Sequence, residues 1–377
     1  MVPARRTRIF IVDDSALMRS LLRSVVASDP LLEVAGTAID GATALAAIQD
    51  LRPDLVLLDV EMPVMDGLVT LRTLRGSGHR MPVIMCSSLT QRGARVTIEA
   101  LAGGASDYVA KPTGQANPAA AAHAMALDLL PKIHALALPP PTQSPAAELL
   151  SPRWPHASAM ALPHRIEAAP PSIVVIGVST GGPAALDILL PSLPASFPLP
   201  VLVVQHMPEL FTGLLAERLN ALCSLRVREA AEGDPVCPGT ISIARGNWHL
   251  EVLAAASGRQ PSTLHLTQRP PENHCRPAVD VLFRSAVAAY GSGVLAVVLT
   301  GMGSDGLAGS RTVRAQGGIV LAQDKATSAV WGMPGAVANA RLAHGVLPIE
   351  AIAGEIARLG RQFSAPEAKN LHEAGAF

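Results

Sequence analysis

The feature that most constrains this chain is the alternation of short β-branched runs with segments of helical periodicity. Within residues 8–135 the runs RIFIV, LEVAGTA, DLVLLD, PVIMCS and DYVAKP are each followed by an amphipathic or Ala-rich segment. Strands that alternate with helices form parallel sheets, because each helix carries the chain back to the end of the sheet where the next strand starts. We therefore predict a doubly wound α/β fold with a five-stranded parallel sheet in this part of the chain.

A second alternating series begins at Ile173, after a Pro- and Ala-rich segment that has no sustained period. The runs IVVIGVS, VLVVQHM, VLAVVLTGMG and GGIVLAQ are typical of strands, and shorter strands are expected in the region 240–267. This predicts a second doubly wound α/β domain, with a mostly parallel sheet and an antiparallel excursion near 240–267. The expected division is a first domain at 1–136, a semi-rigid linker at 137–171, a second domain at 172–365 and a C-terminal tail at 366–377.

Charge and hydropathy exclude several classes of protein. Lys and Arg total 30 and Asp and Glu total 30, so no basic field is available to hold nucleic acid. Apolar runs stay well below the roughly 20 residues that span a bilayer, and MVPARRTRIF leads into a strand without a signal-peptide core. The cysteines show neither close pairing nor zinc-ligand spacing: Cys86, Cys223, Cys237 and Cys275. We expect a cytoplasmic protein with reduced thiols that neither binds nucleic acid nor inserts into a membrane.

Three aspartates follow two predicted strands of the first domain. Asp13 and Asp14 come after the first strand, and Asp59 ends the third. Because the carboxyl ends of parallel strands lie at one edge of a sheet, these side chains are expected to converge there. Clustered carboxylates repel one another unless a hard cation is bound, and Mg²⁺ prefers oxygen ligands while keeping waters for a phosphate donor. Each aspartate taken alone is equally well explained as a solvated loop residue or a helix cap.

Two further polar residues end the fourth and fifth strands, namely Ser87 and Lys111, which offer a hydroxyl and a cation to phosphoryl oxygens. Together, DD, LLDVEMPVMDG, SS and KP resemble the receiver domain of bacterial response regulators. The resemblance implies a flavodoxin-like fold in which Asp59 accepts the phosphoryl group. It also implies a switch pair and a Mg²⁺ site: Ser87 and Lys111 for the switch, and Asp13, Asp14, Asp59 and the backbone of Glu61 for the metal.

The stretch IVVIGVSTGGPAAL at 173–186 places a serine and two glycines directly after a predicted strand. A dinucleotide-binding loop requires glycine at the position of Ser179, and an acidic residue at the end of the next strand to hold the ribose. That strand ends with Gln205 and His206 instead. A serine at such a turn has its hydroxyl exposed at the sheet edge, beside amide groups that can stabilise an oxyanion.

A serine nucleophile needs a base, and His206 at the end of the neighbouring strand is the candidate. The turn in VLAVVLTGMGSDGLAG brings Asp305 to the same edge, which completes a triad in the chain order Ser, His, Asp. That order differs from the Ser, Asp, His order of α/β-hydrolases. Ser179 alone is also explained as a helix N-cap, His206 as a packed histidine and Asp305 as a turn residue.

The segments GVSTGG, VVQHMPELFTGLLAERL, HCRPAVDVLFRSA, LTGMGSDG and QDKATSAVWGMPGAV resemble the catalytic domain of chemotaxis protein-glutamate methylesterases, the CheB family. The resemblance implies Ser179 as nucleophile, His206 as base and Asp305 as orienting acid. It also implies an oxyanion donor and a group that tunes the histidine: the backbone N–H of Met302 and the side chain of Thr180, respectively.

Three other residues of this domain are singled out by the same comparison. Arg245 stands where the family's APG turn has proline, which leaves the conformation of that loop open. His274 and Arg276 are interpreted as structural or substrate-positioning groups rather than catalytic ones.

The implied function is phosphorylation-activated hydrolysis of glutamate methyl esters on chemoreceptors, releasing methanol, with deamidation of receptor glutamines as a second activity. The expected partners are methyl-accepting chemoreceptors as substrate and a chemotaxis-type sensor histidine kinase as phosphodonor. Mg²⁺ is expected for phosphorylation of the receiver, and no cofactor for the ester chemistry. Two alternatives remain open from the residues alone: a receiver-controlled binding protein that uses the second domain as an interaction surface, and a nucleotide-dependent oxidoreductase.

Overall fold

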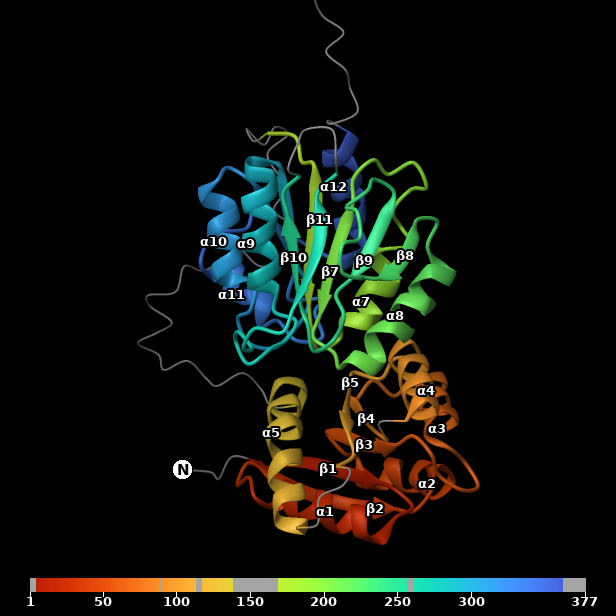
Figure 1. The fold of residues 1–377 in the computed structure, drawn as a ribbon. Coiled ribbons are helices and arrows are strands. Elements are labelled where there is room, and N and C mark those ends of the chain that lie inside the picture. The colour runs from red at the N-terminus through yellow and green to blue at the C-terminus, as the bar shows by residue number, and fades with distance from the viewer. Residues whose placement is uncertain (1–4, 89, 113–116, 138–168, 256–260, 362–377) are drawn as a thin grey trace, which may run out of the picture. The chain divides into compact units, whose positions relative to one another are not determined.

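The computed structural model describes residues 5–88, 90–112, 117–137, 169–255 and 261–361 (Figure 1). Contacts divide the chain into two compact units, Met1–Ala157 and Ser158–Phe377, and each is described by itself. Most of the predicted linker at 137–171 and the whole tail at 366–377 lie outside the described residues. The predicted domain boundaries therefore stay predictions.

The first unit contains a five-stranded sheet in the order β2-β1-β3-β4-β5, and all four neighbouring pairs are parallel. This confirms the predicted five-stranded parallel sheet. The strands are β1 (Thr7–Val12), β2 (Leu32–Ala38), β3 (Leu55–Asp59), β4 (Val83–Ser87) and β5 (Asp107–Ala110). The helices are α1 (Ala16–Ala27), α2 (Gly41–Leu51), α3 (Gly67–Gly76), α4 (Gln91–Ala102) and α5 (Pro118–Ala137).

The core of the first unit follows from strands that are apolar on both faces. Every residue of β3 and β4 is buried, as expected for the central strands of a sheet with helices on both sides. Side chains such as Ile9, Leu57 and Ile84 pack with apolar residues of α1 and α5, including Leu22 and Leu129. The ends of β1 and β3 are thereby held at one edge of the sheet, where Asp13 and Asp59 lie.

The second unit contains a seven-stranded sheet in the order β14-β13-β12-β6-β7-β9-β8, in which every neighbouring pair is parallel. A separate pair, β10 and β11, is antiparallel. The sheet strands are β6 (Ile173–Val178), β7 (Val201–Gln205), β8 (Arg226–Glu229), β9 (Thr240–Ile243), β12 (Val294–Val298), β13 (Ile319–Gln323) and β14 (Gly345–Leu347), and the pair is β10 (His249–Leu253) and β11 (Thr263–Thr267).

The antiparallel excursion is therefore shorter than predicted. The segment that starts near residue 240 was expected to be antiparallel, but β9 pairs in parallel with both β7 and β8. Among the strands of the described residues, β10 and β11 alone run antiparallel, through five residue pairs from His249↔Thr267 to Leu253↔Thr263. The reason is that the chain from β8 to β9 crosses back to the same end of the sheet, whereas β10 and β11 form a pair outside it.

Helices cover the seven-stranded sheet on both faces (Figure 1). The helices are α7 (Gly182–Leu189), α8 (Glu209–Leu222), α9 (Val279–Tyr290), α10 (Leu307–Ala315), α11 (Met333–Asn339) and α12 (Ile349–Arg361). One large core joins sheet residues such as Val175 and Val204 to α9 through Phe283 and to the β10–β11 pair through Leu250. All residues of the central strands β6, β7 and β12 are buried, which makes these strands a rigid base for the loops at their carboxyl ends.

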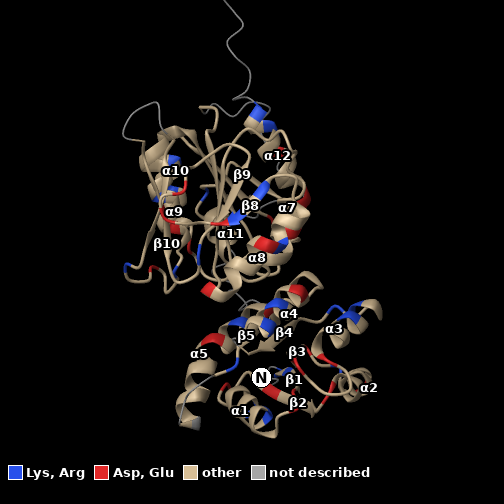
Figure 2. Ribbon diagram, turned by 45° about the vertical axis from the view of Figure 1, so that its right-hand side comes forward, with Lys and Arg blue, Asp and Glu red and all other residues tan. Residues whose placement is uncertain are grey.

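Charged residues of both signs occur in each unit, as the colours of the ribbon in Figure 2 show, in agreement with the formal net charge of zero. Within the described ranges, no helix is both long enough and apolar enough to cross a bilayer.

Candidate active site and phosphorylation site

Three adjacent strands bring the predicted triad to one edge of the second sheet. β6 lies between β7 and β12, with Val178 opposite Gln205 and Gly177 opposite Val298. Ser179 and His206 directly follow paired residues of β6 and β7, and the His206 N–H donates to the carbonyl of Val178 at 3.1 Å. Neighbouring strands are about 4.8 Å apart, so the register places the serine and the histidine side by side.

The Ser179 turn is fixed by its own backbone rather than by its hydroxyl. The Ser179 N–H donates to the carbonyl of Thr300 at 3.0 Å, and its carbonyl accepts from the Gly182 N–H at 2.8 Å. The N-cap of α7 is Gly181, with φ of 77° and no side-chain capping bond, so the interpretation of Ser179 as a helix cap is wrong. A Cβ on Gly181 would meet the Cβ of Ala329 at 2.5 Å, which explains the need for glycine.

Gln205 supports both members of the pair and was not identified from the sequence. Its side-chain Nε2 donates to the carbonyl of Ser179 at 3.0 Å and to that of His206 at 3.2 Å, while the residue is 2% exposed. Its Oε1 is buried and has no hydrogen-bond partner among the described residues, and a Cβ on Gly182 would meet this oxygen at 1.9 Å. The sequence did contain one indication: β7 ends with Gln205, a neutral amide, where a dinucleotide-binding fold would have the carboxylate that holds the ribose.

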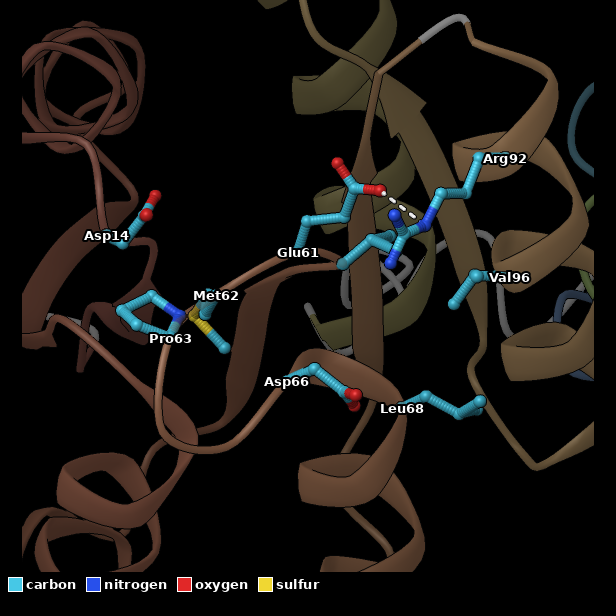
Figure 3. Close-up of a pocket in the computed structure, with 9 residues that line it drawn as sticks. Asp14, Glu61, Met62, Pro63, Asp66, Leu68, Arg92 and Val96 are labelled. Atoms are coloured by element: carbon cyan, nitrogen blue, oxygen red, sulfur yellow. Dashed lines mark ion pairs between the residues drawn. The ribbon is translucent and has the colours of Figure 1, made fainter.

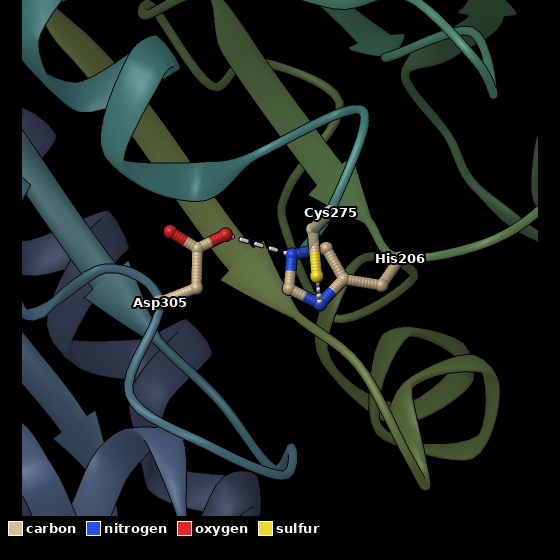
Figure 4. Close-up of side chains that lie close together, drawn as sticks. All are labelled: His206, Cys275 and Asp305. Atoms are coloured by element: carbon tan, nitrogen blue, oxygen red, sulfur yellow. Dashed lines mark hydrogen bonds and ion pairs between the residues drawn. The ribbon is translucent and has the colours of Figure 1, made fainter. Parts of the chain in front are cut away.

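His206 and Asp305 form the central contact of the site (Figure 4). The Nε2 atom of His206 lies 2.8 Å from Oδ2 of Asp305, and the carboxylate is 3% exposed. Burial alone lowers the pKa of His206, but the hydrogen bonds with Asp305 and Cys275 outweigh it and raise the pKa to about 9. A carboxylate on Nε2 places the imidazole proton there and leaves Nδ1 as the basic nitrogen.

Asp305 is held by the N-terminus of α9. Its Oδ2 accepts from the Val279 N–H at 2.7 Å and its Oδ1 from the Asp280 N–H at 3.0 Å. These are N–H groups of the first helical turn, and the N-cap Ala278 supplies no side-chain bond of its own. Burial would raise the pKa of Asp305, but the His206 hydrogen bond and charge and these N–H groups lower it below its ordinary value.

The nitrogen of His206 that Asp305 leaves free contacts Cys275, a residue to which sequence reasoning gave no role. Cys275 Sγ lies 3.6 Å from His206 Nδ1, and among the described residues no hydrogen bond joins that nitrogen to the Ser179 hydroxyl. Asn273, two residues before the cysteine, donates from Nδ2 to Oδ1 of Asp305 at 2.9 Å. The cysteine and asparagine lie in the motif NHCRPAVD, but His206 and Asp305, which they contact, come from distant segments.

The loop after β12 carries the predicted oxyanion donor. Met302 lies between Gly301 and Gly303, and within the described ranges its backbone N–H has no hydrogen-bond acceptor. Gly301 is packed so closely that a Cβ there would meet the Cβ of Ser179 at 2.8 Å, so this loop lies against the serine. Thr180 is buried, and its carbonyl accepts from Thr300 Oγ1 at 2.9 Å. Its predicted action on His206 stays a prediction.

The remaining residues singled out from the sequence have surroundings of their own. Arg245 donates from Nε to Oε1 of Glu209 at 2.8 Å and lies over the Trp248 ring, which gives the loop a support that does not need proline. Arg276 donates to Oδ1 of Asn247 at 2.6 Å and to two backbone carbonyls, as expected for a structural group. His274 is exposed, with φ of 62°.

The raised pKa of His206 predicts a rate that increases with pH. An imidazole accepts a proton only when it is neutral, and the folded protein raises the pKa of His206 from 6.5 to about 9, which favours the charged form at neutral pH. We expect kcat/KM to rise by about tenfold per pH unit below this pKa and to level above it. A pH profile of ester hydrolysis checks this, with circular dichroism at each pH as a control for unfolding. A flat profile between pH 6.5 and 9 would contradict it.

In the first unit, two of the three predicted aspartates form ion pairs with the same lysine. Lys111 Nζ lies 2.8 Å from Oδ2 of Asp13 and 2.7 Å from Oδ1 of Asp59, and both carboxylates are buried. Burial raises the pKa of Asp59 to about 6, although Lys111 acts in the opposite direction. Oxygens of Asp13, Asp14 and Asp59 all lie within 4.8 Å of one another. A cluster of oxygen donors beside a buried carboxylate fits Mg²⁺.

Ser87 and Glu61 border the same edge. The Ser87 hydroxyl accepts from Thr97 Oγ1 at 2.7 Å, and its backbone carbonyl accepts from the Lys111 N–H at 2.8 Å. The side chain of Glu61 forms an ion pair with Arg92 at 3.5 Å. Figure 3 shows this pair at the wall of a cavity of about 590 Å³, which Asp14 also lines. The loop that carries Glu61 is therefore open to solvent beside the aspartate cluster.

Comparisons with known proteins agree with this two-part organisation. Residues 9–122 match the family model of the response regulator receiver domain, and residues 174–356 match that of CheB methylesterase. A protein-glutamate methylesterase/protein-glutamine glutaminase from Nocardioides sp. is 49% identical over 366 residues, covering 94% of this chain and 96% of the relative. One from Trichodesmium erythraeum is 46% identical over 356 residues, covering 93% and 98%. The crystal structure of the Thermotoga maritima CheB methylesterase catalytic domain shares 44% identity and covers 50% of this chain and 98% of that one, with a TM-score of 0.49.

The fold and the comparisons define a response regulator whose effector domain is a hydrolase built on a parallel α/β sheet. Identity of 49% over nearly the whole length of both chains is far above what the fold alone would produce. The chain belongs to the CheB family of protein-glutamate methylesterases/protein-glutamine glutaminases, as the sequence motifs indicated. This membership is incompatible with the nucleotide-dependent oxidoreductase considered for the glycine-rich loop.

Proposed function

We propose that this chain hydrolyses glutamate methyl esters on chemoreceptors, and deamidates receptor glutamines, through a triad of Ser179, His206 and Asp305. The observation that carries the proposal is the buried contact of 2.8 Å between His206 Nε2 and Asp305 Oδ2. The parallel register of β6 and β7 places this histidine beside Ser179. Family membership supplies the reaction class, a carboxylic ester hydrolysis.

Each triad member has one task in the proposed reaction. The Ser179 hydroxyl attacks the ester carbonyl while Nδ1 of His206 takes its proton, and Asp305 holds Nε2 and stabilises the imidazolium. The Met302 N–H donates to the oxyanion of the tetrahedral intermediate. The imidazolium then protonates the departing methoxide, or the departing amine in the glutamine reaction. Water, activated by the same nitrogen, hydrolyses the acyl-enzyme and regenerates Ser179. Thr180 would adjust the orientation of His206.

We propose that phosphorylation of Asp59 controls this activity. Asp13, Asp14 and Asp59, with the backbone carbonyl of Glu61, would hold Mg²⁺, which when bound neutralises phosphoryl oxygens. Lys111 already contacts two of these carboxylates and would transfer its ion pair to the new phosphoryl group. Ser87 would exchange its bond with Thr97 for one to the same group. The phosphodonor is proposed to be a sensor histidine kinase of the chemotaxis pathway.

The experiment that tests the whole proposal is methanol release from methylated chemoreceptor membranes by the full chain with Mg²⁺, with and without a small-molecule phosphodonor such as acetyl phosphate. Release that increases with the donor supports both the triad and receiver control. No release under either condition, with a folded protein, would mean that the chain acts on another acyl substrate.

Removal of the acceptor carboxylate should abolish activation without removing basal activity. We expect Asp59→Asn to release methanol at the unstimulated rate whether or not the phosphodonor is present, because its amide cannot form an acyl phosphate. The matched control is Asp54→Asn, since Asp54 is a partly exposed carboxylate that pairs with Arg5. That variant should remain activatable. Stimulation of Asp59→Asn equal to that of the unmodified chain would show that phosphorylation occurs elsewhere.

A further inference from the structure

The thiol of Cys275 lies at the one nitrogen of His206 on which the proposed reaction depends. Asp305 holds Nε2 at 2.8 Å, so Nδ1 is the nitrogen left to take a proton, and Cys275 Sγ is 3.6 Å from it (Figure 4). These three residues form a Cys-His-Asp arrangement that shares its base with Ser179. A thiol is far more acidic than a serine hydroxyl, so it transfers its proton to such an imidazole more readily.

The turn that carries Cys275 is built to keep the sulfur in place. Glu272 and Cys275 exchange two backbone hydrogen bonds, of 3.1 Å and 2.8 Å, which close a tight turn. Asn273 within that turn donates to Oδ1 of Asp305 at 2.9 Å and to Oδ2 of Asp280 at 3.0 Å. The turn that carries the cysteine and the imidazole are thus both hydrogen-bonded to the same buried carboxylate.

The four cysteines of the chain differ in their surroundings. Cys86 is fully buried, and burial raises the pKa of its thiol far above the ordinary value. Burial and the charge of Asp187 raise the pKa of Cys223 to about 11. Cys237 and Cys275 are both half-buried, but among the described residues an imidazole contacts Cys275 alone. Both residues are partly exposed, and one of the two thiols has a base beside it.

We propose that Cys275 is a redox-sensitive thiol whose oxidation by a hydroperoxide to a sulfenic acid switches the esterase off by blocking the catalytic nitrogen of His206. The inference rests on the proposed function for its effect on the enzyme, but not for the reactivity of the thiol. The added oxygen would lie between the sulfur and Nδ1, where it hydrogen-bonds the imidazole and prevents it from accepting the proton of Ser179.

The chemistry balances with the peroxide as the oxidant. Nδ1 takes the thiol proton, the thiolate sulfur attacks one peroxide oxygen, and the O–O bond breaks as the S–O bond forms. With hydrogen peroxide the leaving group is hydroxide, which takes that proton back from Nδ1 and departs as water, so the sulfur loses the two electrons that the peroxide gains. Two thiol molecules reverse the change: the first displaces water to give a mixed disulfide, and the second releases the Cys275 thiol.

The test treats the full chain with hydrogen peroxide and follows two readouts. Labelling of each cysteine by dimedone, measured by peptide mass spectrometry, should be at least roughly tenfold faster at Cys275 than at Cys237. Among the described residues an imidazole that can take the thiol proton contacts Cys275 and not Cys237. Methanol release should fall in parallel with Cys275 labelling and return with dithiothreitol when dimedone is omitted. Labelling of Cys275 at the rate of Cys237 would overturn the proposal.

Three variants separate the causes. Cys275→Ala should keep its own untreated rate after peroxide, whereas Cys237→Ala should be inactivated like the unmodified chain. His206→Gln, which removes the base, should slow Cys275 labelling to that of Cys237. Equal fractional inactivation of Cys275→Ala would overturn the switch. If the untreated chain released no methanol, the proposed function would fail, while the labelling ratio and its loss in His206→Gln would still decide the reactivity of the thiol.

Discussion

Replacement of Ser179 by alanine is expected to lower kcat/KM for methyl-ester hydrolysis by about four orders of magnitude, or about 5.5 kcal/mol of transition-state stabilisation. In the proposed reaction the hydroxyl oxygen of Ser179 forms the bond to the acyl carbon, and Ser179 directly follows Val178, the strand partner of the residue before His206. The fold should be unchanged, because the turn is fixed by backbone hydrogen bonds of Ser179 rather than by its side chain.

The measurement is methanol release from methylated receptor membranes at a saturating phosphodonor concentration, with circular dichroism melts of both proteins. Ser192→Ala is the matched control, because Ser192 lies in the same domain, is exposed and bonds only the carbonyl of Ile188 among the described residues. It should retain nearly full activity. Turnover by Ser179→Ala within tenfold of the unmodified chain would rule out Ser179 as the nucleophile and direct attention to Cys275, the other nucleophilic side chain beside His206.

Replacement of Asp305 by asparagine is expected to reduce kcat on the order of 10⁴-fold, because a neutral amide neither fixes the imidazole tautomer nor stabilises the imidazolium. It should also shift the rising limb of the pH profile downward. The carboxylate is one of the groups that raise the pKa of His206, so without it the histidine titrates at lower pH. If Asp305 were only structural, its replacement would lower the rate at every pH but would leave the pH at which the rate rises unchanged.

The same change should lower stability by about 1–3 kcal/mol. Asp305 accepts hydrogen bonds from the backbone N–H groups of Val279 and Asp280. The NH₂ group of an asparagine cannot accept a hydrogen bond, so one of these N–H groups would lose its partner. Thermal melts would measure this loss, and assays below the melting temperature would separate it from the catalytic effect. Asp187→Asn is the control, since it removes a carboxylate paired with Arg218 in the same domain. An Asp305→Asn protein with near-normal kcat would exclude the triad.

Much of the fold was predictable because it rests on local patterns. Runs of Val, Ile and Leu five or six residues long, separated by helical segments, require parallel strands buried on both faces, and both sheets are built in this way. The one error concerned β9, which pairs in parallel. Its sequence does not differ from that of an antiparallel strand, because pairing direction depends on where the chain returns.

The candidate residues were also predictable, since parallel strands place their carboxyl ends at one edge whatever lies between them. Asp13 and Asp59 follow or end strands of the first sheet, and Ser179 and His206 follow strands of the second, so topology alone brings each pair to an edge of its own sheet. The sequence by itself therefore determined the fold class, the family and the groups that carry the proposed chemistry.

The tertiary structure alone decided how those groups are held. Gln205 as a clamp on the serine turn, α9 as the support of Asp305, and Cys275 at the free nitrogen of His206 all depend on contacts between distant segments. Cys275 and His206 are 69 residues apart, and no periodicity or spacing connects them. Side-chain contacts of this kind are set by the packing of helices and loops on the sheet, which the order of residues along the chain does not reveal.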